Sequence, residues 1–132
     1  MEKKSVVGVV SNNGKVLILS KRSDFKDSWH LPSGEVKQSE EPEEAILNRM
    51  KEKVDLDINL KDFIDVLKLP KSSLYFYECE SQTKSVKLNN GSNDFKWINV
   101  EKIPDFISKD AINILPIEVK KRLKLHNSYL DF

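Results

Sequence analysis

The middle of the chain, residues 29–58, reads WHLPSGEVKQSEEPEEAILNRMKEKVDLDI. Pro42 is placed to begin a helix, because the first helical position does not need a backbone N–H. Glutamates flank it, and the helix dipole favours negative charge at a helix N-terminus. Apolar residues then recur at four-residue spacing and form one stripe, made of Ile46, Met50 and Val54. This pattern predicts a helix that begins at Pro42 and ends near Asp55.

Two apolar runs precede this helix, at residues 6–10 and 16–19. Asn13 and Gly14 lie between them, and this pair is the strongest short signal for a β-hairpin because both residues accept a positive φ. Both runs are continuous rather than alternating, which is typical of strands that are buried on both faces. The polar segment at residues 21–28 is expected to be a loop.

The second half of the chain predicts further strands and a helical end. The expected elements are strands at residues 63–69, 74–80 and 95–100, a weaker strand at 85–88, and a helical region at 111–125 whose second part starts at Pro116. Strands that are followed by a central helix and a terminal helix indicate an α/β fold, in which helices cover the sheet on more than one side. Residues 1–132 have the common length of one domain, and we expect a single domain.

The composition argues against a nucleic-acid-binding protein that acts through bulk charge and against a membrane protein. The 22 Lys and Arg residues nearly balance the 21 Asp and Glu residues, whereas a protein that binds nucleic acid through bulk positive charge would be more basic. Cys79 is the only cysteine and cannot form an intramolecular disulfide, which favours a reducing compartment. The sequence has no apolar run near about 18 residues and no signal-peptide pattern. We therefore expect a cytoplasmic protein that does not contact a membrane.

The quoted stretch resembles the box of the Nudix hydrolase family (MutT-like), which reads G-x5-E-x7-R-E-U-x-E-E-x-G-U, where U is a bulky aliphatic residue. The spacing fits without a gap over residues 34–56. Five positions match the box: Gly34, Glu40, Met50, Glu52 and Leu56. The approach that begins at Trp29, the early hairpin and the late strand with Trp97 are also similar to the family. The resemblance therefore covers nearly the whole chain.

The resemblance implies a Nudix-like α-β-α sandwich with a mixed central β-sheet, a box loop and helix, and a C-terminal helix. It also implies a hydrolase that cleaves a nucleoside diphosphate linked to another moiety, with Mg²⁺ as the cofactor. In that chemistry Mg²⁺ neutralises the diphosphate and lowers the pKa of the attacking water, and carboxylates supply its ligands. Many relatives in the family are dimers, so a homodimer is a further expectation.

The sequence departs from the family pattern at Ser33, Asn48, Arg49, Lys53 and Asp55. Arg49 stands where the family has a glutamate that is treated as metal ligand and base, and Lys53 replaces the second of the paired glutamates. Neither side chain can ligate a cation, because both are hydrogen-bond donors only. Glu52 and Glu40 remain as the candidate catalytic residues and as weak candidate metal ligands. Mg²⁺ is expected only if the protein is catalytically active.

Two interpretations of Arg49 and Lys53 stay open. Both could pair with Glu40 and Glu52 on a solvated helix face, where each pair contributes only a few tenths of a kcal/mol. Both could instead contact phosphate directly and replace the positive charge of the metal, since the helical wheel places them at the border of the apolar stripe. Pairing is the more ordinary outcome, and we keep both residues as candidate substrate-binding residues.

The remaining candidates are weaker. Trp29, His30 and Gly34 are candidate substrate-binding residues in the approach to the box, although a lone loop histidine is more often structural. Other aromatic residues could stack on a base, namely Phe25, Tyr75 and Tyr77. Strand aromatics are usually core residues, as expected for Trp97. A basic C-terminal face at residues 120–124 could meet RNA, but such charge runs are usually solvated and the net charge does not indicate RNA.

Three functions follow from these observations. The first is a Nudix-fold protein that binds a nucleotide or a nucleoside-diphosphate compound with weak or no hydrolysis. The second is an active Mg²⁺-dependent hydrolase with a non-standard site around Glu52 and Glu40. The third is a partner-binding module without a small-molecule ligand. We favour the first, because the loss of two box glutamates and the arginine is difficult to reconcile with a working metal site.

Overall fold

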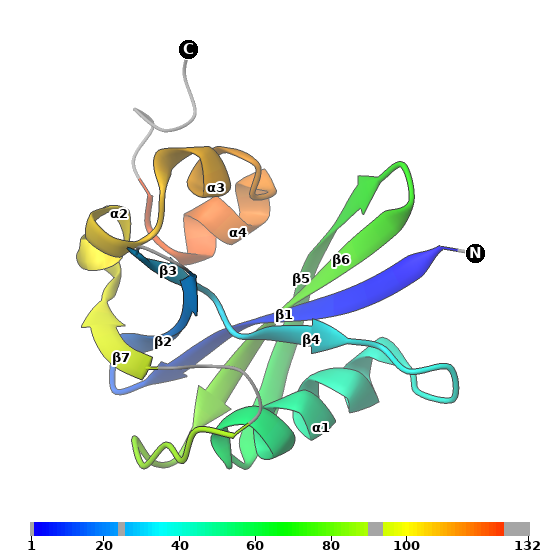
Figure 1. Ribbon diagram of the computed structural model, residues 1–132, viewed down its shortest axis with the longest axis horizontal. Coiled ribbons are helices and arrows are strands. Elements are labelled where there is room, and N and C mark those ends of the chain that lie inside the picture. The colour runs from blue at the N-terminus through cyan, green and yellow to red at the C-terminus, as the bar shows by residue number, and fades with distance from the viewer. Residues whose placement is uncertain (1, 24–25, 90–93, 126–132) are drawn as a thin grey trace.

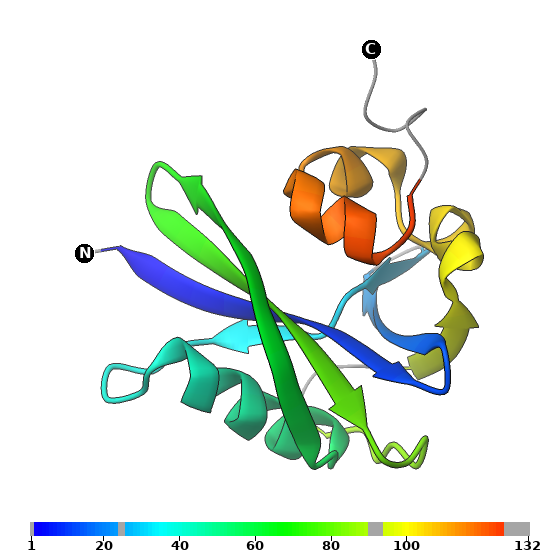
Figure 2. The ribbon, with the colours of Figure 1, turned by 180° about the vertical axis from the view of Figure 1, so that it is seen from behind.

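The chain folds as an α-β-α sandwich in a computed structural model that describes residues 2–23, 26–89 and 94–125 (Figure 1). The strands are β1 (Lys3–Asn12), β2 (Lys15–Ser23), β3 (Lys26–His30), β4 (Ser33–Glu35), β5 (Ile58–Leu69), β6 (Ser72–Ser81) and β7 (Asp94–Asn99). The helices are α1 (Pro42–Val54), α2 (Ile103–Phe106), α3 (Lys109–Asn113) and α4 (Ile117–Arg122). Helix α1 covers one face of the sheet and α2–α4 cover the other, as the reverse view also shows (Figure 2). This architecture confirms the predicted fold class.

The sheet is mixed and has β1 at its centre. One edge of β1 pairs in parallel with β6, and β6 pairs with β5 in a long antiparallel hairpin. The other edge of β1 pairs first with β4 and then, at Ser11 and Asn12, with β2. Strand β2 continues away from β1 and pairs with β3 and β7. The predicted hairpin turn is confirmed, with φ values of 50° at Asn13 and 79° at Gly14.

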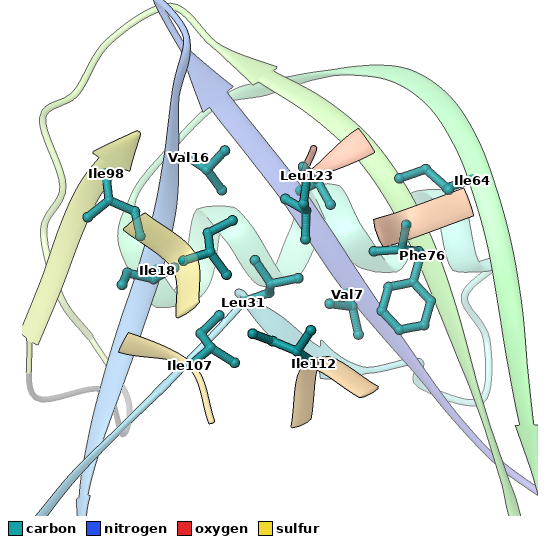
Figure 3. Packing of buried hydrophobic residues seen from close by; sticks show 13 residues of the cluster. Val7, Val16, Ile18, Leu31, Ile64, Phe76, Ile98, Ile107, Ile112 and Leu123 are labelled. Carbon is teal, nitrogen blue, oxygen red and sulfur yellow. The ribbon is translucent and has the colours of Figure 1, made fainter. Parts of the chain in front are cut away.

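The first strand is buried on both of its faces, as its continuous apolar run predicts. Val6 and Val10 contribute to the core beneath α1, while Val7 and Val9 contribute to the core beneath α2–α4. Figure 3 shows this second core, in which residues of the sheet such as Phe76 meet Ile107, Ile112 and Leu123 from the C-terminal region. The two cores fix α1 and the C-terminal helices on opposite sides of the same strand.

Two predicted segments differ from the structure. The polar segment at residues 21–28 is not a simple loop, because Lys21–Ser23 extend β2 and pair with Lys26–Ser28 of β3, residues 24 and 25 lying outside the described part. Polar residues occur in strands as well as in loops, so polarity alone does not determine the backbone conformation. The weaker strand at residues 85–88 is also wrong. There the N–H groups of Lys87 and Asn89 donate to the last carbonyls of α1 rather than to a neighbouring strand.

Other boundaries move by a few residues. The strand expected at 63–69 begins earlier, at Ile58, and the helical region expected at 111–125 is two short helices separated at Pro116. Strand β4 and helix α2 were not predicted, because neither is long enough to show a periodic pattern. Helix α1 begins at Pro42 as predicted, with a capping box in which Glu44 accepts a hydrogen bond from the Glu41 N–H.

Asp55 ends helix α1 in the left-handed region, with φ 56° and ψ 39°. This conformation favours glycine, so we expect Asp55→Gly to raise the free energy of unfolding by about 0.5 kcal/mol. The gain is partly offset by the lost ion pair with Lys51, which is exposed. Urea denaturation measures the change. Asp57→Gly removes the other carboxylate that pairs with Lys51 at a position without positive φ, and it should not stabilise the protein.

Candidate functional site

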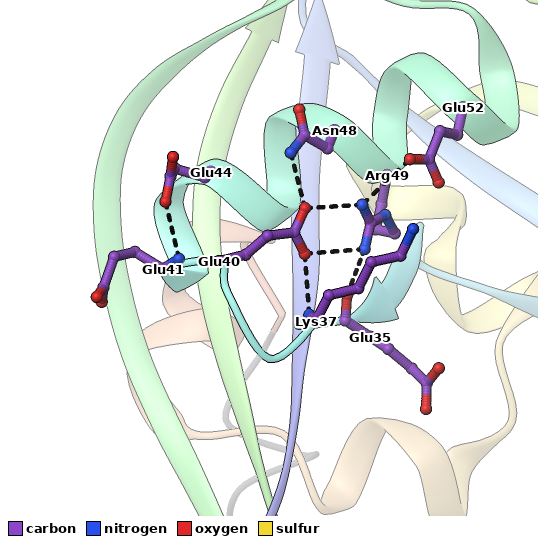
Figure 4. A network of polar contacts seen from close by, with 8 residues as sticks. All are labelled: Glu35, Lys37, Glu40, Glu41, Glu44, Asn48, Arg49 and Glu52. Carbon is purple, nitrogen blue, oxygen red and sulfur yellow. Dashed lines mark hydrogen bonds and ion pairs between the residues drawn. The ribbon is translucent and has the colours of Figure 1, made fainter.

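Helix α1 and the loop after β4 bring the box residues together around Arg49 (Figure 4). The Arg49 guanidinium binds the Glu40 carboxylate through two bonds, of 3.1 Å from Nη1 and 2.9 Å from Nη2. Its Nη2 also lies 3.1 Å from Glu52 Oε2, and Nη1 donates to the Glu35 carbonyl at 2.9 Å. Arg49 therefore links the two candidate catalytic glutamates to each other and to β4.

Arg49 is buried, which the sequence did not predict. The whole residue is only 4% exposed, and the Glu40 side chain is 13% exposed. The predicted pairing with Glu40 and Glu52 is present, but the predicted solvated helix face is wrong at this position. An ion pair removed from water depends much more on complete pairing than an exposed pair does.

Gly34 explains how an arginine can lie so close to the backbone of β4. A Cβ atom at Gly34 would lie 2.3 Å from Arg49 Cγ and 2.9 Å from both its Cβ and its Cδ. These distances are far below van der Waals contact, so only glycine fits beside this arginine. Gly34 thus positions the Arg49 side chain.

The Glu40 carboxylate is fully ionised at neutral pH. Hydrogen bonds from the Asn48 side chain, at 2.7 Å, and from the Lys37 N–H, at 2.9 Å, together with Arg49, lower the pKa of Glu40 from 4.5 to about 2. Asn48, at the box position where the family has arginine, therefore binds Glu40. Its amide does so without adding a charge.

Lys53 does not make the predicted ion pairs. Its Nζ donates to the Ser33 carbonyl at 2.8 Å, and no described carboxylate lies within ion-pair distance of it. Burial lowers the pKa of Lys53, and the positive charges of Arg49 and Lys21 lower it further. An ammonium group has three N–H donors, so this desolvated cation keeps donors for an anion.

A pocket of about 420 Å³ opens beside Lys53, between the sheet and the α2–α3 region. Four of the candidate substrate-binding residues line it together: Trp29, His30, Gly34 and Lys53. The other three candidates, Glu40, Arg49 and Glu52, are not among its lining residues. Trp29 is held edge-to-face against Phe106 at 5.8 Å between ring centroids, and His30 Nδ1 lies 3.0 Å from the Leu31 carbonyl oxygen. The size is that of a small-molecule site.

Much of the pocket wall could not be found from sequence. Ser5, Glu35 and the apolar residues of β5, β6 and the α2–α3 region also line it. These residues are far apart in the chain and carry no motif, and strand pairing alone brings them together. A contiguous box pattern therefore reveals one end of the pocket only.

The other candidates lie away from this pocket. Tyr75 and Tyr77 belong to the core beneath α1, on the opposite face of the sheet, and Trp97 packs there as expected. Phe25 lies outside the described residues. Burial raises the pKa of the Cys79 thiol to about 12, so this cysteine is not a reactive thiolate at neutral pH.

The basic C-terminal face is already engaged within the chain. Lys120 is buried and donates to the Asn113 carbonyl, and Arg122 binds Asp62 and Glu78 of the β5–β6 hairpin. Lys121 pairs with Glu118 on its own helix. This face therefore ties α4 to the sheet.

The described residues do not fit a metal centre of the kind that the box implies. Both candidate ligands, Glu40 and Glu52, already bind Arg49, whose positive charge occupies the space between them. Across residues 2–23, 26–89 and 94–125, no three or more His, Cys, Asp or Glu side chains gather where they could hold a metal ion. In the same ranges, no helix has the length and apolar character needed to span a membrane.

Fold and site together define a Nudix-type domain with an arginine at the centre of its box helix. The family model described as "NUDIX domain" matches residues 1–116, so the chain belongs to the Nudix family. Nudix hydrolase 5 of Arabidopsis thaliana is 24% identical over 107 residues, which cover 70% of this chain and 34% of that protein. The chain thus spans about a third of the length of this curated relative.

Solved structures support the same fold. A NUDIX hydrolase from Nitrosomonas europaea superposes with a TM-score of 0.79 at 15% identity, covering 96% of this chain and 73% of the other. An ADP-ribose pyrophosphatase from Streptococcus suis superposes with a TM-score of 0.65 at 15% identity, covering 76% of each chain. At these identities the likeness establishes the fold alone.

The Glu40 contacts predict a defined dependence of stability on pH. A carboxyl whose pKa is lowered by folding stabilises the protein above its unfolded pKa, and this stabilisation is lost as the pH falls through the folded value. We therefore expect the difference in unfolding free energy between the wild type and Glu40→Gln to be constant above about pH 5 and to close between about 4.5 and 2. Urea denaturation across this range measures it. A difference that persists unchanged at pH 2 would contradict the assignment.

Proposed function

We propose that this Nudix protein binds a phosphate-bearing small molecule of the nucleoside-diphosphate type without a metal ion, and hydrolyses it weakly or not at all. The observation that carries the proposal is the placement of Arg49 between Glu40 and Glu52. A hydrolase of this family type needs carboxylates that are free to ligate Mg²⁺. Here both carboxylates bind the same guanidinium within the protein.

Lys53 supplies the positive charge for the proposed binding. It lies at the pocket wall, bonds to one backbone carbonyl and has a lowered pKa because it is partly desolvated. A phosphate can accept hydrogen bonds from the N–H donors of this partly desolvated ammonium. Such charge-assisted hydrogen bonds are stronger than neutral ones. The name of one structural neighbour, an ADP-ribose pyrophosphatase, supports a diphosphate-containing ligand.

The test is calorimetric titration of inorganic pyrophosphate and of ADP-ribose into the protein in EDTA. We expect both to bind, and we expect Lys53→Gln to weaken pyrophosphate binding by roughly tenfold or more, because a hydrogen bond to a charged group contributes about 1.5–3 kcal/mol. Lys51→Gln is the matched control, since Lys51 lies on the same helix but pairs with Asp55 and Asp57. It should leave the affinity unchanged.

Other outcomes would contradict the proposal. Equal loss in the Lys53 and Lys51 variants would show that bulk charge, and not the pocket, attracts the anion. Binding that requires Mg²⁺ and is abolished by Glu52→Gln would favour the active hydrolase instead. No binding of any phosphate compound by the folded protein would favour a partner-binding module.

We further propose a cytoplasmic location and a single domain over residues 1–132. The one cysteine is buried and unpaired, which supports a reducing compartment. The homodimer stays a prediction, and light scattering of the purified protein measures it directly.

A further inference from the structure

The polarity of the pocket changes in one direction across the sheet. Its floor follows paired residues of β4, β1, β6 and β5, and residues paired across neighbouring strands point to the same face. One such row, all of it lining the pocket, reads Glu35, Ser5, Leu74 and Leu67. The row beside it reads Ser33, Val7 and Phe76. Each row passes from a polar residue on β4 to an apolar residue on β6, and the first row continues to Leu67 of β5.

The wall opposite the floor is also apolar. It is formed by Ile107 directly after α2, Ala111 of α3, and Ile114 and Leu115 directly after α3. Among the residues that line the pocket, β5, β6 and the α2–α3 region contribute no polar side chain. Every charged or hydroxyl-bearing lining residue belongs instead to β1, β4 or α1, and His30 of β3 lies just before β4. The pocket is therefore polar at one end only.

This division restricts the ligand. A sugar or a nucleobase that filled the apolar end would leave its hydroxyl, carbonyl or amino groups without partners, and burial of an unpaired polar group is costly. A hydrocarbon group has no hydrogen bonds to lose there, and its transfer from water to the apolar end is favourable in free energy. The anionic end of the same molecule is attracted by Lys53, which has no ion-pair partner among the described carboxylates.

We propose that the pocket holds an amphiphilic phosphate ester, with its phosphate or diphosphate at Lys53 and its apolar organic group between the β5–β6 end of the sheet and α3. This inference rests on the phosphate site at Lys53 in the proposed function, and it goes beyond that proposal in the organic group, because a hydrocarbon group takes the place of the nucleoside. Diphosphates with an alkyl or isoprenoid-like group are the ligand class, in preference to diphosphates whose second group is a sugar.

The experiment is a calorimetric titration in EDTA with pyrophosphate, a series of ethyl, butyl, hexyl and octyl diphosphates below their micelle concentrations, and ADP-ribose. Affinity should rise along the series by about fourfold for each methylene that becomes buried, until the pocket is full. Octyl diphosphate should bind more tightly than ADP-ribose. Lys53→Gln should weaken every member of the series by a similar factor.

Two exposed isoleucines provide a matched pair of variants that the fold should tolerate. Ile114 lines the pocket and is 61% exposed, whereas Ile117 does not line it and is 59% exposed. Ile114→Gln should weaken octyl diphosphate binding by at least about fivefold, through lost apolar contact, and leave pyrophosphate binding unchanged. Ile117→Gln should change neither.

The outcomes separate this inference from the function on which it rests. If pyrophosphate binds through Lys53 but affinity does not rise with chain length, the inference is overturned and the proposed function stands. Tighter binding of ADP-ribose than of octyl diphosphate, or equal effects of the two isoleucine variants, would also overturn it. If no diphosphate binds at all, the proposed function fails, and the inference fails with it.

Discussion

Arg49→Met is expected to lower the free energy of unfolding by about 3 kcal/mol, because it leaves buried negative charge without its partner. Methionine retains much of the length of the side chain, so the loss reports on charge and hydrogen bonds more than on packing. The value lies at the low end of the range for broken buried ion pairs. Glu40 keeps its bonds from Asn48 and the Lys37 N–H, and the Glu52 side chain is 46% exposed.

A double-mutant cycle tests whether the loss comes from the unpaired carboxylate. Glu40→Gln in the Arg49→Met background removes the negative charge that the first substitution leaves unpaired. We expect the double variant to be less destabilised than the sum of the two single variants, by urea denaturation with unchanged slope. Additive losses would show that Arg49 and Glu40 do not depend on each other.

Gly34→Ala is expected to destabilise the protein by about 2–3 kcal/mol, through overpacking against Arg49. The added Cβ would meet the stem of a side chain whose guanidinium is fixed by contacts to Glu35, Glu40 and Glu52, so the arginine cannot rotate away without losing them. Thermal and urea denaturation both measure the change. Binding of pyrophosphate should weaken as well, because β4 forms the polar end of the pocket.

Gly8→Ala is the control variant, because it replaces a glycine by alanine at a position away from Arg49. A Cβ at Gly8 would lie 3.1 Å from Val10 Cγ2 and 3.3 Å from Ile46 Cδ1, which are the ends of side chains and can shift. Its cost should be clearly smaller. Truncation by Arg49→Ala should also make Gly34→Ala less costly than in the wild type, since it removes the atom at 2.3 Å. Equal costs in both backgrounds would contradict the steric explanation.

The sequence predicted best those features that depend on a local pattern of residues. Pro42, the spacing of the apolar stripe and the Asn13-Gly14 turn each depend on local geometry, and the structure confirms all three. The box also located Glu40, Arg49 and Glu52 in one cluster. The positive φ at Asp55 shows why the family pattern has a glycine at that position.

Properties set by packing could not be predicted in the same way. The burial of Arg49 depends on β4, a three-residue strand without a periodic signal, which lies over the helix and leaves room for the side chain only at Gly34. The apolar end of the pocket depends on β1 pairing with β6 in parallel, across about 70 residues of sequence, and no local pattern reports such a register. Lys53 lies at the pocket because its Nζ donates to the Ser33 carbonyl of β4, a contact that no local sequence pattern indicates.

We propose that the internal ion pair of Arg49 takes the place of metal chemistry in this protein. The most direct test of this proposal is turnover of a panel of ADP-ribose, dinucleoside polyphosphates and deoxynucleoside triphosphates by the pure, folded protein, with and without Mg²⁺. We expect weak or no cleavage, and no acceleration by Mg²⁺, from protein that still binds pyrophosphate in EDTA. Mg²⁺-dependent cleavage that Glu52→Gln abolishes would contradict the account and would show that a catalytic metal site assembles despite Arg49.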